Sequence, residues 1–155
     1  MEDAQKKYII CDCAPEKWGK TPTLKKLIDQ LTHDSNYSFI EERGAHDTVK
    51  DKWFVFEHIH SKKQIIIQTE GDYDTSFNPT MEYLKEHQKD VSVVICASRG
   101  VNSNAYNEMQ KMAIEYGMEI ILFRNYHLKD TKGTSDLLYN LCAKQIKELL
   151  ELIII

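Results

Sequence analysis

The sequence lacks a long apolar segment and any excess of basic residues. No run approaches the roughly 18 uninterrupted apolar residues that a membrane helix needs, and residues 1–7 are polar, unlike a secretory signal peptide. The 24 acidic residues outweigh the 20 basic ones, so the net charge is −4. We therefore expect a cytoplasmic protein with no membrane partner and no broad electrostatic attraction to nucleic acid.

Sequence signatures of several enzyme classes and of metal sites are also missing. The chain contains no nucleophile elbow, no dinucleotide-binding glycine fingerprint and no HExxH motif. No CxxC pair is present, so we expect the cysteines to be buried thiols without disulfide or metal partners. His58 and His60 alternate along one apolar run, but a zinc site needs three or four protein ligands. We expect two exposed histidines at a hairpin tip.

Short apolar runs alternate with helical patterns along the whole chain. The apolar runs predict strands at 8–13, 37–41, 91–96 and 118–123 and a hairpin formed by 53–59 and 64–67. Apolar residues at helical spacing predict helices at 20–32, at about 79–88 and from about 134 to the last residue. A further helix follows the 97–103 loop and ends at Gly117. Without a repeat or linker, residues 1–155 form one domain. The order predicts an α/β fold, a three-layer and mostly parallel sheet with one hairpin and helices on both faces.

The loop after the first strand carries the sharpest motif. Residues 14–21 read Ala-Pro-Glu-Lys-Trp-Gly-Lys-Thr, whereas the phosphate-binding pattern is Gly, four residues, then Gly-Lys-Thr/Ser. The last three positions match at the right spacing, and Ala14 replaces the first glycine. Gly19 can bring its backbone close to a phosphate, Lys20 supplies a cation and Thr21 a hydroxyl for Mg²⁺.

Strand, loop and helix together resemble a P-loop NTPase with a degenerate Walker A motif. The resemblance implies the P-loop fold, a nucleotide such as ATP or another phosphorylated ligand, and Mg²⁺ as cofactor. Lys20 takes a catalytic role in this interpretation, and Thr21 and Glu70 are the expected metal ligands. The expected nucleotide contacts are Trp18, Gly19, Lys20, Thr21, Pro22 and Arg99. Hydrophobic cover of the loop is an alternative role for Trp18, and surface ion pairing is the alternative for Arg99.

The second motif of such proteins is altered. Ile65-Ile66-Ile67 leads into Gln68-Thr69-Glu70-Gly71-Asp72, and alignment on Gly71 places Gln68 where the resemblance implies an aspartate beside Mg²⁺. An amide cannot replace the charge of a carboxylate there. Asp72 stands where small GTPases orient the attacking water, which makes it the candidate general base. The alternative for this acidic segment is a solvated turn in which Asp74 or Ser76 caps the next helix.

Other parts of the resemblance limit the classes of ligand and enzyme that we expect. Thr48 falls loosely at the switch threonine of small GTPases. Cys96-Ala97-Ser98-Arg99 stands where their guanine signature would be, which argues against GTP. With three arginines in the chain, the arginine-bearing lid of nucleotide kinases is not expected. Arg124 and Asn125 follow the 118–123 strand and are weaker candidate contacts.

The last helix carries a broad apolar stripe and ends in Ile153-Ile154-Ile155. Three isoleucines in water cost about 1.5–3 kcal/mol each, so we expect burial, either against their own domain or in a homo-oligomer.

Two functions fit these patterns. The first is a small nucleotide-binding protein, with adenine favoured over guanine, whose NTP hydrolysis or phosphoryl transfer is weak or partner-dependent because of Gln68. The alternative is a non-catalytic interaction module that keeps a degenerate P-loop fold. A transferase for another phosphorylated or sulfated ligand stays open as well.

Overall fold

The computed structural model describes residues 5–15, 18–44, 52–69, 74–126 and 135–154. Six strands are present in these residues: β1 (Lys7–Cys13), β2 (Tyr37–Gly44), β3 (Lys52–His58), β4 (Gln64–Gln68), β5 (Val91–Ser98) and β6 (Met118–Phe123). The helices are α1 (Lys20–Thr32), α2 (Asn78–His87), α3 (Asn104–Tyr116) and α4 (Ser135–Ile153), with a short 3₁₀ turn, η1 (Asp74–Phe77), before α2.

The strands form a single mixed sheet in the order β2-β3-β4-β5-β1-β6. β4, β5, β1 and β6 run parallel, while β3 runs antiparallel to both β2 and β4. The predicted hairpin is therefore confirmed as β3–β4. β2 extends beyond the predicted 37–41 run because its later residues continue to pair with β3, past a bulge between Phe39 and Glu41.

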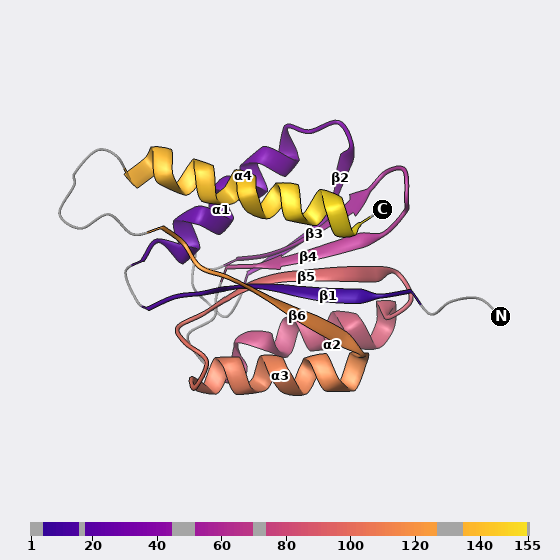
Figure 1. The fold of residues 1–155 in the computed structure, drawn as a ribbon. Coiled ribbons are helices and arrows are strands. Elements are labelled where there is room, and N and C mark those ends of the chain that lie inside the picture. Colours follow the sequence, from indigo (N-terminus) through magenta and orange to yellow (C-terminus); the bar gives the residue numbers. More distant parts are fainter. Residues whose placement is uncertain (1–4, 16–17, 45–51, 70–73, 127–134, 155) are drawn as a thin grey trace.

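Two helices cover each face of the sheet, so the α/β class and the layering are confirmed (Figure 1). On one face, α1 and α4 pack over Ile10 and Ile95, with Leu24, Leu27 and Ile146 fully buried between them. α2 and α3 cover the other face. Alternation along β1 sends Ile9, Cys11 and Cys13 to the α2/α3 face and Ile10 to the α1/α4 face. Both faces of β1 are thus buried, as its apolar sequence requires.

The helix ends follow local sequence rules, with one correction. Ser103 caps α3, its side chain accepting a hydrogen bond from the Tyr106 backbone N–H, and Gly117 ends α3 at a φ of 66°, as predicted. The alternative in which Asp74 or Ser76 caps α2 is wrong, because the residue at the N-cap is Phe77. α2 instead begins after Phe77 without a side-chain cap, because η1 leads directly into it.

The carboxyl end of α4 packs within its own domain. Ile154 is buried in the α1/α4 face of the core together with Leu31 and Leu150, whereas Leu152 is 75% exposed. Ile154 is therefore buried against its own domain, which is one of the two expected modes of burial. No helix within the described ranges is both long enough and apolar enough to cross a membrane.

Candidate functional site

The predicted phosphate-binding loop starts at the centre of the parallel strands. β1 and β5 are neighbours, and Cys13 at the end of β1 lies opposite Ser98 at the end of β5. The helix that follows β1 is on one face of the sheet and the helix that follows β5 is on the other (Figure 1). In α/β proteins, ligands bind beyond the carboxyl ends of two such strands, because the diverging connections leave a crevice there.

The Lys20 side chain occupies this position. Its Nζ donates hydrogen bonds to the carbonyl oxygens of Ala14, at 2.5 Å, and of Ser98, at 3.1 Å. The Ala14 backbone N–H also donates to the Ser98 carbonyl, at 3.1 Å, so the loop is tied to the end of β5. Lys20 is only 9% exposed. The ammonium therefore lies between the carboxyl ends of β1 and β5 and does not extend into bulk solvent.

Gly19 begins α1 in a left-handed conformation, with φ 82° and ψ 26°. Its carbonyl accepts the Thr23 N–H at 3.0 Å, and the N-terminus of α1 has no side-chain cap. The first N–H groups of a helix have no partner within the helix and carry its positive dipole end, so such a terminus favours anions. The ring of Tyr139, on α4, packs against Gly19: a Cβ added there would lie 2.1 Å from the ring.

Thr21 and Gln68 both lie at the end of β4, but they form hydrogen bonds with different partners. The Thr21 hydroxyl donates to the Thr69 carbonyl at 3.3 Å, which joins the first turn of α1 to the residue after β4. The Gln68 carbonyl oxygen accepts a 2.7 Å hydrogen bond from the hydroxyl of Thr80, and that hydroxyl accepts one from the Trp53 indole N–H at 2.9 Å. Gln68 is buried in this chain of hydrogen bonds. Its amide therefore anchors α2 to the sheet.

The residues after β6 hold the described part of the loop from the other side. The Arg124 guanidinium lies 5.3 Å from the centre of the Trp18 ring, a cation–π contact. The Asn125 side-chain N–H₂ donates to the Trp18 carbonyl at 3.1 Å and to the Thr23 hydroxyl at 2.8 Å. Trp18 is half-buried and held by the segment after β6, and its two predicted roles stay predictions. Asn125, a weak candidate in the sequence, positions this segment.

Asp12 is a buried carboxyl group that the sequence analysis did not single out. It alternates with Cys11 and Cys13 and therefore faces α1 and α4, and it is 0% exposed. No described group completes a hydrogen bond with either carboxylate oxygen. Burial raises the pKa of Asp12 to about 7, against the opposing effects of the Lys20 charge and the Asn125 backbone N–H. A charged residue inside an apolar run was the signal available in the sequence.

The remaining predicted site residues fall into two groups. Arg99 follows β5 at the same end of the sheet and has an exposed side chain, as does Pro22 in the first turn of α1. Glu70, Asp72 and Thr48 lie outside the described residues, so their predicted roles stay predictions.

The predicted buried thiols are confirmed. All four cysteines are free and buried, at positions 11, 13, 96 and 142. A hydrogen bond with Cys11 and burial raise the pKa of Cys13, so the thiol at the end of β1 stays neutral. Within the described part of the chain, no group of three or more His, Cys, Asp or Glu side chains could hold a metal ion.

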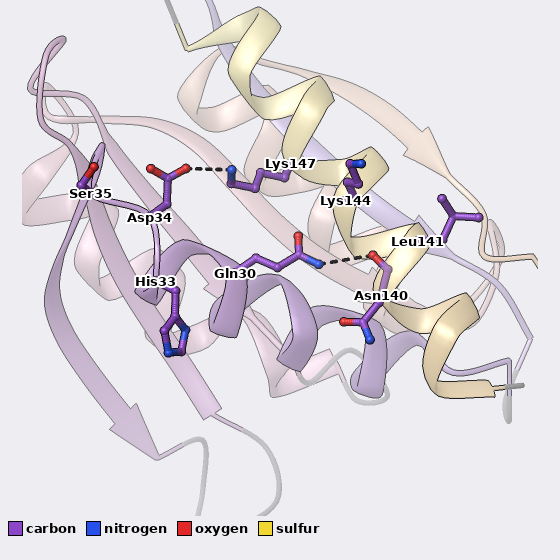
Figure 2. Close-up of a pocket in the computed structure, with 8 residues that line it drawn as sticks. All are labelled: Gln30, His33, Asp34, Ser35, Asn140, Leu141, Lys144 and Lys147. Carbon is purple, nitrogen blue, oxygen red and sulfur yellow. Dashed lines mark hydrogen bonds and ion pairs between the residues drawn. The ribbon is translucent and has the colours of Figure 1, made fainter. Parts of the chain in front are cut away.

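A separate groove lies at the opposite end of α1 (Figure 2). It has a volume of about 630 Å³ and is lined by Gln30, His33, Asp34, Ser35, Asn140, Leu141, Lys144 and Lys147. Lys147 pairs with Asp34 at 2.7 Å and with Glu151 at 3.1 Å, so its charge is already neutralised. The Lys147 ammonium lowers the pKa of Asp34. This groove is open and contains none of the predicted site residues.

Comparison with known proteins adds no further assignment. Neither the family models, nor the curated proteins, nor the solved structures include a significant match to this chain.

Proposed function

We propose that the chain binds the phosphoryl groups of a nucleotide, with ATP as the favoured ligand, at the carboxyl ends of β1 and β5. The observation that carries the proposal is the buried Lys20 ammonium, held by the Ala14 and Ser98 carbonyls beside the uncapped N-terminus of α1. A cation and a helix terminus that converge at the crevice between two central strands suit a phosphate. The resemblance to P-loop NTPases rests on the same residues.

Ligand binding at this site replaces the contacts that Lys20 makes with the protein. A carbonyl oxygen bears only a partial negative charge, whereas a phosphate oxygen shares a full one, so the charge-assisted hydrogen bond to phosphate is stronger. The ammonium is pre-positioned and little exposed, which reduces the side-chain entropy lost on binding. Lys20 therefore acts as the charged anchor of the proposed site.

Phosphoryl transfer or hydrolysis at this site would be weak. The Gln68 amide, at the position where a carboxylate would be expected, is engaged by Thr80 in the interior. Among the described residues, the Thr21 hydroxyl is placed beside the end of β4, where it could contact a Mg²⁺ ion brought by the nucleotide. Such an ion keeps several waters and phosphate oxygens as ligands, so one protein hydroxyl is compatible with it.

A thermal-shift series with ATP, GTP and Mg²⁺ tests the proposal. A ligand at about 100 times its dissociation constant stabilises the folded state by roughly 2.7 kcal/mol. We expect a rise in melting temperature with Mg-ATP, a smaller one with GTP, and none in Lys20→Ala.

The matched control is Lys25→Ala, which removes an exposed lysine from the same helix and should leave the ATP-induced shift unchanged. Lys20→Ala also loses two buried hydrogen bonds and starts from a lower melting temperature, so the readout is the shift on adding ligand. Equal shifts in the wild type and Lys20→Ala would remove Lys20 from the site.

A second candidate function is a non-catalytic interaction module. The specific observation in its favour is the Tyr139 ring against Gly19, where a phosphate-binding loop would bring its backbone close to the ligand. The engagement of Gln68 with Thr80 also favours it. In the same thermal-shift series this candidate predicts no stabilisation by any nucleotide at any Mg²⁺ concentration.

A further inference from the structure

The buried carboxyl group of Asp12 has no role in the proposed anchor, yet it lies beside it. It is the second-last residue of β1, two positions before Ala14, whose carbonyl accepts the Lys20 ammonium. Its neighbours across the sheet are Ala97 on β5 and Phe123 on β6, so no polar side chain flanks it there. The Asn125 backbone N–H lies close enough to favour the carboxylate but does not complete a hydrogen bond with it, so the charged form of the buried group is costly.

Several charged and titratable groups on the neighbouring elements affect the ionisation of Asp12. α1 contributes Lys20, whose charge favours the carboxylate, and the segment after β6 contributes the Asn125 backbone N–H. β1 contributes Cys11 and Cys13 and α4 contributes Cys142, and the pKa of each thiol is raised, by hydrogen bonds with neighbouring thiols and burial in β1 and by burial in α4. Near neutral pH the thiols hold their protons, so among these described neighbours Lys20 is the charge that stabilises ionised Asp12.

We propose that anion binding at the loop is coupled to the uptake of a proton by Asp12. This inference rests on the proposed function, because it describes the regulation of that same site. An anion on Lys20 neutralises the charge that favours the Asp12 carboxylate and adds a negative charge of its own nearby. Both changes favour the protonated carboxyl group. The proton comes from solvent and is released again when the anion leaves.

Linkage fixes the direction of the effect on affinity. Because the complex binds more protons than the free protein, a higher pH opposes binding. The free protein titrates at Asp12 near a pKa of about 7, and a neighbouring charge typically moves such a value by one or more. Over the interval from pH 6.5 to 8.5 this coupling weakens anion binding about tenfold.

Sulfate is the probe of choice, because it remains a dianion throughout this interval and cannot itself supply the proton. Binding is followed by tryptophan fluorescence, since Trp18 lies in the loop. Trp18→Phe identifies the contribution of the second tryptophan, Trp53, which is buried in the core. The dissociation constant is measured at pH 6.5 and at pH 8.5 in the wild type and in Asp12→Asn, which has the shape of the neutral acid and no titration.

A second measurement follows the proton directly: sulfate is added to weakly buffered wild-type and Asp12→Asn protein near pH 7.5, and the proton taken up is recorded with an indicator dye. We expect proton uptake for each bound sulfate in the wild type to exceed that in Asp12→Asn by a fraction of one proton. We also expect about tenfold weaker binding at pH 8.5 in the wild type and a much smaller change in Asp12→Asn. Both proteins contain the same six histidines, so the readout is the difference between them.

The two proposals fail in different ways. If sulfate and Mg-ATP bind through Lys20 but no proton is taken up, or if Asp12→Asn keeps the full pH dependence, the coupling is wrong and the binding site stands. If neither anion binds the wild type at either pH, the proposed function is wrong and the coupling falls with it. Should Asp12→Asn not fold, the wild type still decides: sulfate binding without proton uptake, or with an affinity that does not fall between pH 6.5 and pH 8.5, overturns the coupling.

Discussion

Gly19 meets two demands that no other residue type satisfies at the start of α1. Its φ of 82° is costly for a residue with a Cβ, by roughly 1 kcal/mol. In addition, a Cβ would collide with the Tyr139 ring, which must then move. We expect Gly19→Ala to lower the free energy of unfolding by about 1–3 kcal/mol, measured by urea denaturation.

Gly100→Ala is the matched control, because nothing lies within 4 Å of a Cβ built there. It should change stability by less than about 0.5 kcal/mol. The double variant Gly19→Ala/Tyr139→Ala separates the two causes: it should show less than the sum of the single losses, because the collision is absent. A strictly additive result would mean that the ring does not restrict this position.

Asn125 secures the loop to α1 through two hydrogen bonds, one to the Trp18 carbonyl and one to the Thr23 hydroxyl. Its side chain is 2% exposed, so truncation leaves both partners without a replacement in the interior. We expect Asn125→Ala to cost about 1–3 kcal/mol in urea denaturation and to alter the Trp18 fluorescence. Asn107→Ala, at an exposed position of α3, is the control and should leave both unchanged.

These residues show what a motif predicts and what it misses. The Gly-Lys-Thr spacing correctly predicted that Lys20 and Thr21 lie at the start of α1, because strand, loop and helix are continuous in sequence. It did not predict Tyr139 against Gly19, since more than 100 positions separate them and nothing local to α4 signals the contact. Asp12 was visible in the sequence as a charge within an apolar run, but its burial depends on how α1 and α4 cover β1.

For helices and strands, the predicted boundaries agree best with the observed ones where hydrophobic periodicity coincides with a local sequence signal for the start or end of the element. The predicted ranges 20–32 and 118–123 match α1 and β6. β2 runs to Gly44 because pairing with β3, which is tertiary context, outweighs its charged residues. The predicted start of α2 at about residue 79 agrees with Asn78, but its capping residue could not be predicted, because η1 supplies a helical entry in place of a side-chain cap.

Ser103 holds the first turn of α3 next to the proposed site. Its hydroxyl oxygen accepts the Tyr106 N–H at 3.1 Å, donates to the Gly100 carbonyl at 2.9 Å and lies 3.1 Å from the Ser98 hydroxyl. We expect Ser103→Ala to destabilise the protein by about 1–2 kcal/mol in urea denaturation. Ser103→Asp preserves the capping oxygen and should restore at least half of that loss. A loss of the same size in both variants would show that the cap is not the cause.

For the whole molecule, the layered class follows from the alternation of strands and helices, but the strand order does not. Periodicity reports which face of an element is buried and says nothing about which strands are neighbours. The position of β1 between β5 and β6 is set by how the connections cross the sheet. It is this order that brings Ser98 beside Ala14 and gives Lys20 its second carbonyl partner. The candidate site therefore depends on topology as much as on the motif.

The free energy of unfolding should depend on pH because of Asp12. The carboxyl group has a pKa of about 7 in the folded protein, raised by burial from 3.8. Between these values the folded state holds a proton that the unfolded state has released, so stability falls as the pH rises from about 4 to about 7 and changes little from this source above that. The total loss is about 2–4 kcal/mol.

Asp12→Asn isolates this contribution, because the amide is neutral at every pH. We expect the urea midpoint of the variant to vary less between pH 4 and pH 8 and to exceed that of the wild type at pH 8, where the wild type carries a buried charge. Asp34, whose pKa Lys147 lowers, has the opposite slope at acid pH but is present in both proteins and cancels in the comparison. A wild-type protein at least as stable as Asp12→Asn at pH 8 would mean that the charged carboxylate is solvated or paired after all. In that case the site would have no group poised to exchange a proton when an anion reaches Lys20.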